Sequence, residues 1–208
     1  MLIRSAATAL ALALASPALA QTAPAETATE VQIQPDVTMG AEDAPLTIIE
    51  YASFTCGHCA AFHDENLPKL KAEYIDTGKV RFIQRDVYFD PVGLWAGILA
   101  RCGGDDKYYA VSDMLFDEQR SWLGGGSGDE IAANLRKIGL KAGMTDEQMT
   151  ACWDDKAKAE SLIATYQKNA TADKIEATPS FVIGGELVSN ESWDAMKKII
   201  DDKLAKAQ

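Results

Sequence analysis

Two cysteines three residues apart carry the most reactive pattern in the chain, Cys56-Gly57-His58-Cys59. At the predicted start of a helix these thiols lie within reach of each other, so a disulfide can open and close there without unfolding. Cys56 comes first, where the helix dipole, unpaired N–H groups and a protonated His58 would stabilise a thiolate and lower the thiol pKa. A thiol of low pKa is a good leaving group, so its disulfide oxidises other dithiols well. Cys59, one turn further on, would be the buried resolving thiol.

Two other interpretations of this cysteine pair stay open, a structural disulfide and half of a zinc site. A zinc ribbon requires a second C-x-x-C motif, whereas the other cysteines of the chain, Cys102 and Cys152, are isolated. The pattern therefore favours a redox-active pair.

The elements around the motif predict a β-α-β unit. Residues 46–52 form an apolar, β-branched run typical of a buried strand, and residues 80–85 form a second strand. Between them, a helical pattern covers residues 56–75, with a kink expected at Pro68 and a C-cap at Gly78. Short connections of this kind predict parallel strands joined by a right-handed crossover.

Strand character returns near the end of the chain. Residues 180–188 predict a hairpin around the turn Gly184-Gly185, and Asn190 could cap a final helix. A lone hairpin is at best marginally stable, so it should join the sheet of the β-α-β unit. Residues 90–173 show only helical periodicity. The order of elements predicts an α/β fold with an inserted all-helical domain.

The first residues have the parts of a secretory signal peptide, which we place at residues 1–20. Arg4 is followed by a short Ala/Leu-rich run and the small-residue triplet Ala18-Leu19-Ala20. An uncleaved anchor is the alternative. Residues 21–38 are expected to form a flexible lead-in, with one short strand near residues 31–33. The mature chain should be soluble and outside the cytoplasm, where disulfides persist.

Composition excludes several classes of protein. The chain has 208 residues, 47% hydrophobic and 25% charged, which is not the usage of a disordered or fibrous protein. Its formal net charge of −11 argues against nucleic acid and against anionic membrane surfaces. Two histidines are too few for a histidine-rich metal site, and the glycine run at residues 124–126 follows no strand and lacks the lysine of a P-loop. We therefore expect no metal and no cofactor.

Two motifs, together with the helical insertion, resemble the DsbA family of thioredoxin-fold proteins. They are FTCGHC at residues 54–59 and ATPSF at residues 177–181. The resemblance implies a thioredoxin-like domain built from residues 39–89 and 174–208, with residues 90–173 inserted as a helical domain. It also implies a thiol:disulfide oxidoreductase of the bacterial periplasm.

The resemblance assigns a substrate-binding role to two residues near the hairpin. Pro179 would be a cis-proline facing the active-site disulfide, and the backbone of Thr178 would hydrogen-bond an incoming extended peptide. From the residues alone, Pro179 could instead be an ordinary trans proline at the start of a strand.

The resemblance also assigns proton and charge roles near the cysteines. Glu50 lies six residues before Cys56, the spacing at which this fold keeps a buried acid near the second cysteine, where it could accept and return a proton. A surface glutamate is the alternative. His58 would stabilise the thiolate. His63 matches no part of the motif and is expected to face solvent or to pack in a helix contact.

The remaining cysteines, Cys102 and Cys152, each fall on the apolar face of a predicted helix. They could be two buried free thiols, because cysteine is a common core residue. In an oxidising compartment we favour a structural disulfide within the helical domain, and some bacterial relatives of the family carry such a second bridge.

The function predicted from these observations is a dithiol oxidase that donates the Cys56–Cys59 disulfide to reduced exported proteins. The resemblance implies re-oxidation by a quinone-linked membrane partner like DsbB, and the short region 21–38 favours a monomer. A reductase or isomerase on the same fold is the alternative, because Gly-His between the cysteines is typical of eukaryotic protein disulfide isomerase and Thr178 is shared with periplasmic isomerases. A metal-binding module is a weaker alternative, since copper-delivery proteins of this fold use C-x-x-x-C with a distant histidine. The reduction potential of the cysteine pair decides between oxidase and reductase.

Overall fold

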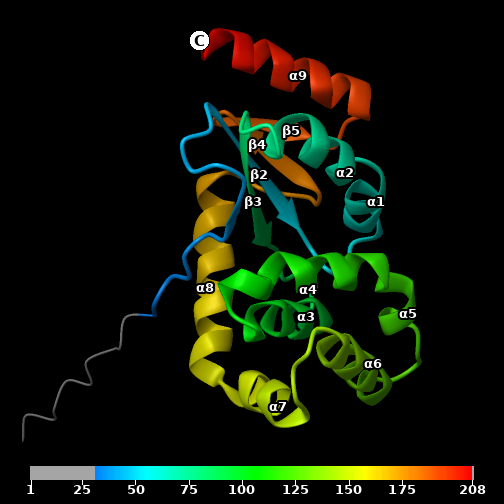
Figure 1. Cartoon of the computed structure of the whole chain (residues 1–208). Helices are drawn as coiled ribbons and strands as arrows, with labels where there is room; N and C mark the ends of the chain where they lie inside the picture. Colours follow the sequence, from blue (N-terminus) through cyan, green and yellow to red (C-terminus); the bar gives the residue numbers. More distant parts are fainter. Residues whose placement is uncertain (1–30, 208) are drawn as a thin grey trace, which may run out of the picture. The chain divides into compact units, whose positions relative to one another are not determined.

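A five-stranded mixed sheet lies at the centre of residues 31–207, the part of the chain that the computed structural model describes (Figure 1). The strands, in chain order, are β1 (Thr38–Met39), β2 (Leu46–Ala52), β3 (Val80–Asp86), β4 (Ser180–Ile183) and β5 (Glu186–Ser189). Their order across the sheet is β1-β3-β2-β4-β5, with β2 parallel to β3 and all other pairs antiparallel. The predicted β-α-β unit and hairpin thus share one sheet. The predicted signal peptide, residues 1–20, lies outside the described residues.

The central strand β2 explains where the cysteine motif lies. Its sequence LTIIEYA alternates between the two faces of the sheet, and both faces are covered. On one face, Ile48 packs with α1 (Gly57–Glu65), α2 (Leu67–Leu70) and α9 (Trp193–Lys206); on the other, Tyr51 packs against α8 (Lys156–Ala172). The strand ends at Ala52, and α1 begins after a tight turn, so the cysteine motif lies at the carboxyl end of β2.

The helix predicted over residues 56–75 is interrupted, as expected from Pro68. It comprises α1, α2 and one π-helical turn, η1 (Lys71–Ile75), with the break at Asn66. Pro68 lies in the first turn of α2, where a missing N–H costs nothing.

Helices fill the chain between β3 and β4, which confirms the predicted helical insertion. They are α3 (Pro91–Cys102), α4 (Asp105–Asp117), α5 (Gln119–Leu123), α6 (Gly128–Lys141), α7 (Asp146–Asp154) and α8. Ser127 with Glu130 and Thr145 with Gln148 form capping boxes that fix the starts of α6 and α7. The short helix α5 has too few residues for a periodic pattern, so the sequence did not predict it.

The start of the last helix differs from the prediction. Ser192, not Asn190, caps α9, because the Ser192 side chain accepts a hydrogen bond from the backbone N–H of Ala195.

No helix within residues 31–207 combines the length and apolar character needed to cross a bilayer.

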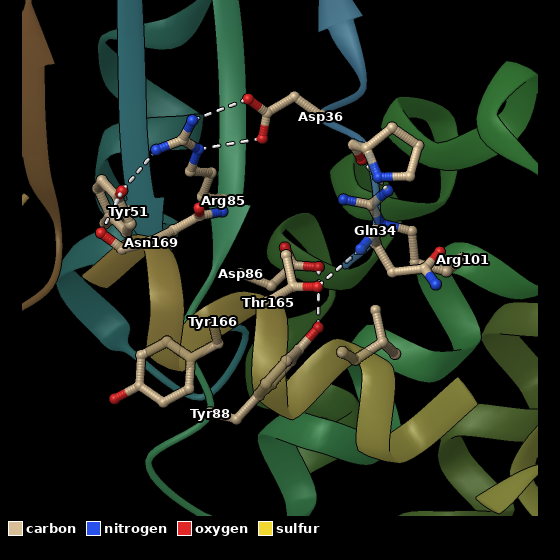
Figure 2. Close-up of a pocket in the computed structure, with 12 residues that line it drawn as sticks. Gln34, Asp36, Tyr51, Arg85, Asp86, Tyr88, Arg101, Thr165, Tyr166 and Asn169 are labelled. Atoms are coloured by element: carbon tan, nitrogen blue, oxygen red, sulfur yellow. Dashed lines mark hydrogen bonds and ion pairs between the residues drawn. The ribbon is translucent and has the colours of Figure 1, made fainter. Parts of the chain in front are cut away.

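The segment predicted as a flexible lead-in is held against the fold over residues 34–37. The Arg85 guanidinium binds both carboxylate oxygens of Asp36 at 3.0 and 2.9 Å (Figure 2). The N–H of Gln34 donates to the Thr165 hydroxyl at 2.8 Å. The short strand predicted at residues 31–33 is wrong: the strand is β1, which pairs with β3. These partners lie far away in sequence, so the local composition of the segment could not reveal them.

Candidate active site

Cys56 is the N-cap residue of α1, and its thiol faces two other segments of the chain. Its backbone is extended, and its sulfur accepts a hydrogen bond from the N–H of Cys59 at 3.3 Å. The same sulfur lies 3.4 Å from the carbonyl oxygen of Thr178 in the loop before β4. Cys56 is half-buried, Cys59 is fully buried, and both are free thiols in this structure. The structure therefore brings together Cys56, Cys59 and the segment around Pro179, as the sequence predicts.

Hydrogen bonds to the sulfur lower the pKa of the Cys56 thiol from its ordinary value to about 5. The largest contribution is the hydrogen bond from the Cys59 side chain; the Thr178 side chain and the backbone N–H groups of Cys59 and His58 add to it, while burial opposes it. Cys56 is therefore mostly a thiolate at neutral pH.

The environment of Cys59 acts in the opposite direction. Burial raises the pKa of the Cys59 thiol well above its ordinary value, and the hydrogen bond to Cys56 and the charge of Glu50 raise it further. One thiol of the pair is thus ionised and accessible, while its neighbour is protonated and buried.

Glu50 lies under α1 and is completely buried, so the alternative of a surface glutamate is wrong. Its Oε2 lies 2.9 Å from Nε2 of His63, and the imidazole stacks on the ring of Phe116 at a centroid distance of 3.9 Å. His63 is only 6% exposed, so of the two expected environments, solvent is wrong and helix packing is correct. The sequence carried one signal for it: His63 follows Cys59 by four residues and so shares its helix face.

A hollow opens beside the backbone of Thr178, close to the reactive sulfur of Cys56. It is lined by His58, Ala177, Thr178, Pro179, Ser180, Ser189 and Asn190. The peptide bond between Thr178 and Pro179 is cis, as the resemblance implied, and the trans alternative is wrong. His58 itself is exposed and contributes to the low pKa of Cys56 through its backbone N–H. A role for its imidazole charge stays a prediction.

The helical insertion holds the loop that precedes Cys56. The Gln119 side-chain amide donates to the carbonyl oxygens of Phe54 and Cys56 at 2.8 and 2.9 Å. The Thr55 hydroxyl donates to Asp90 at 2.7 Å, and Asp90 also caps α3. The sequence gives no signal for these positioning residues, because Gln119 lies 63 residues from Cys56 and belongs to no motif.

Cys102 and Cys152 form a disulfide that joins α3 to α7, with a Cα–Cα distance of 5.8 Å. The alternative of two free thiols is therefore wrong.

Within residues 31–207, no three His, Cys, Asp or Glu side chains gather in a group that could hold a metal ion.

Comparison with known proteins places these features in one family. A family model described as thioredoxin matches residues 32–202. A putative protein-disulfide oxidoreductase of Rickettsia bellii is 32% identical over 174 residues, which cover 83% of this chain and 66% of that protein. A probable disulfide bond formation protein D of Bacillus anthracis is 29% identical, over 81% of this chain and 78% of that protein. The chain thus spans less than two thirds of the Rickettsia bellii relative.

Among solved structures, Wolbachia pipientis alpha-DsbA1 is similar in fold. It has a TM-score of 0.75 and 26% sequence identity, and the match covers 86% of this chain and 95% of that one. The predicted fold class, a thioredoxin-type sheet with inserted helices, is therefore confirmed.

Proposed function

The chain belongs to the thioredoxin family, and from the chemistry of its cysteine pair we propose that it is a thiol:disulfide oxidoreductase. The single observation that carries this proposal is the opposed state of the two thiols: the pKa of Cys56 is lowered to about 5, and that of Cys59 is raised. A half-exposed thiolate beside a buried thiol at a helix start can form and release a disulfide with a second protein. The names of the relatives in Rickettsia and Bacillus agree with this chemistry.

The direction that we propose is oxidation of substrate dithiols. A substrate thiolate attacks the sulfur of Cys56, the Cys56–Cys59 bond breaks, and Cys59 leaves with the electron pair and takes a proton. A second substrate thiolate then attacks the substrate sulfur of the mixed disulfide and releases Cys56 as a thiolate. The substrate dithiol is oxidised and the cysteine pair is reduced. Because the hydrogen bonds at Cys56 stabilise its thiolate, they stabilise the reduced protein and so favour its acting as the oxidant.

Glu50 supplies the proton step at Cys59. A buried carboxyl group whose charge acts on Cys59 can deliver a proton when Cys59 leaves and accept it when Cys59 attacks. The Cys102–Cys152 bridge has a structural role in this proposal, because it lies within the helical insertion.

The substrates we propose are reduced, unfolded exported proteins. The hollow between His58 and Asn190 is lined by Thr178, whose carbonyl oxygen lies 3.4 Å from the sulfur of Cys56, and it leaves room for an extended peptide beside the Thr178 backbone. The predicted signal peptide and the second disulfide both support an oxidising location such as the periplasm. Re-oxidation by a DsbB-like membrane partner, and action as a monomer, complete the proposal.

Equilibration of the Cys56–Cys59 pair with glutathione buffers tests the direction, with alkylated thiols counted by mass spectrometry. A reduction potential of about −120 to −180 mV supports an oxidant over a reductant, and a value at the −120 mV end, as in DsbA, favours the oxidase over an isomerase. A potential of about −270 mV, as in thioredoxin, would refute it and favour a reductase. Cys102 and Cys152 should stay oxidised throughout. Failure of Cys56 and Cys59 to form a disulfide would refute the oxidoreductase itself.

A further inference from the structure

A histidine outside the cysteine motif is buried against the acid beneath the active site. Nε2 of His63 lies 2.9 Å from Oε2 of Glu50, and their side chains are 3% and 0% exposed. Oε1 of Glu50 and Nδ1 of His63 are also buried, and neither has a hydrogen-bond partner among the described residues. Burying polar atoms without partners is unfavourable, and a buried ionisable pair is often no more stable than apolar side chains of similar volume. Stability alone therefore gives a poor account of the pair.

The Glu50–His63 pair lies close to Cys59, a buried thiol that needs a proton acceptor. Cys59 must lose its proton to attack a mixed disulfide at Cys56, yet burial and the charge of Glu50 both raise the pKa of Cys59. A carboxylate alone offers one site for that proton. An imidazole hydrogen-bonded to the carboxylate offers a second site for the proton. When the imidazole is protonated, its positive charge compensates the negative charge of the carboxylate.

We propose that His63 positions and charges Glu50 so that the two side chains together take the Cys59 proton when Cys59 attacks and return it when Cys59 leaves. This inference rests on the proposed oxidoreductase function. Before the attack, the pair is a carboxylate that accepts a hydrogen bond from a neutral imidazole. During the attack, Cys59 forms a bond to the sulfur of Cys56, the bond from Cys56 to its partner breaks, and the partner leaves as a thiolate. The proton of Cys59 passes to the pair, which then has no net charge.

The surroundings of the imidazole come from three elements. On α1, Cys59 lies one turn before His63; on β2, Glu50 faces it; on α4, Phe116 stacks on its ring. Burial raises the pKa of Asp113, also on α4, and His63 in its protonated form acts against that rise. Tyr109 of α4 has a raised pKa, mainly through burial, to which the charge of Glu50 also contributes. Glu50 is the group that contacts the imidazole directly.

The attack by Cys59 can be measured on its own. Mixing the reduced protein with saturating oxidised glutathione forms the mixed disulfide at Cys56, and the limiting rate is then the displacement of glutathione by Cys59. No external thiolate takes part in that displacement, so its pH profile belongs to the protein. Acid quenching and mass spectrometry of the mixed disulfide follow it between about pH 5 and pH 9.

The wild-type rate should fall at low pH, where the pair already holds the extra proton, and level off at higher pH. The titration midpoint of the pair is measured by NMR of His63 on the same protein, whose sequence has two histidines. In His63→Gln, which keeps a side-chain N–H for Glu50 but no ionisable proton, the neutral-pH rate should fall at least about tenfold. The rate should then rise with pH across the whole range. In a Glu50→Gln background, His63→Gln should have little further effect, because the two residues act as a unit.

Phe116→Leu is the matched control, because it removes the ring stacked on the imidazole but no proton site. It should keep the wild-type pH profile. Equal profiles for wild type and His63→Gln, or the same change in Phe116→Leu, would overturn the inference. So would a wild-type kinetic midpoint that differs from the NMR midpoint of His63, a comparison that needs no variant to fold. A wild-type protein that never displaces glutathione would instead overturn the proposed function.

Discussion

The low pKa of Cys56 predicts that the reduced protein gains stability with rising pH, relative to the oxidised protein. In the disulfide neither sulfur titrates. In the dithiol form, Cys56 ionises near pH 5 when folded but nearer its ordinary value when unfolded. A depressed pKa contributes stability that is complete above the unfolded pKa and is lost as pH falls through the folded pKa. The free energy of unfolding of the reduced form should therefore rise between about pH 5 and pH 8.

The magnitude follows from one proton over three pH units. A full effect would be about 1.4 kcal/mol per unit, or about 4 kcal/mol in total. Cys56 is half-buried, so solvent screening reduces this, and we expect about 2 kcal/mol. Above about pH 8 the sign reverses for Cys59, because its raised pKa keeps it protonated in the folded state while the unfolded thiol ionises. The pH range in which the reduced form gains stability therefore ends near pH 8.

Urea unfolding of the two redox forms at several pH values measures this difference. Reduction is confined to the Cys56–Cys59 pair, as checked by mass spectrometry of alkylated thiols, so that the second disulfide stays intact. Cys56→Ser cannot form the disulfide and its hydroxyl does not titrate in this range, so the pH dependence of its free energy of unfolding from pH 5 to pH 8 should match that of oxidised wild type. A constant difference between reduced and oxidised wild type from pH 5 to pH 8 would refute the assignment of a stabilised Cys56 thiolate.

Three further predictions concern the framework of the site. Replacing Cys102 and Cys152 by Ala together should lower the free energy of unfolding by about 4 kcal/mol in urea, since the bridge closes a loop of 50 residues; an unchanged midpoint would contradict a structural role. Gln119→Met should cost about 1–3 kcal/mol and speed hydrogen exchange in the active-site loop, because it leaves two backbone carbonyls without their donor. Gly97→Ala should cost about 1–3 kcal/mol in thermal or urea unfolding, since its new methyl group would lie 2.5 Å from the ring of Tyr88.

The sequence predicted best where structure is set locally. The apolar run of β2 and the break near Pro68 each depend on a few neighbouring residues, and each was confirmed. The position of Cys56 at a helix start followed in the same way, because a strand, a turn and a helix are adjacent in the chain.

Prediction from the sequence failed where contacts with residues far away in the chain determine the local structure. Residues 34–37 looked flexible by composition, yet Asp36 binds an arginine 49 positions away. His63 lacked a motif, and its environment depends on β2 and α4, which only the folded chain brings to α1. Gln119 offers no local signal at all. Such contacts involve single polar side chains, whose partners cannot be inferred from periodicity.

One hydrogen bond links the opposite behaviour of the two active-site thiols. When the Cys59 thiol donates to the Cys56 sulfur, it lowers the pKa of Cys56 and at the same time raises its own. The geometry of this hydrogen bond depends on the position of Cys56 as the N-cap residue of α1 and of Cys59 in the first turn of the helix, on its buried face. The asymmetry that makes Cys56 the attacked sulfur and Cys59 the proton-dependent one therefore arises from the strand-to-helix turn. The remaining task at the site is to move a single proton to and from Cys59, the step for which we propose the buried pair of Glu50 and His63.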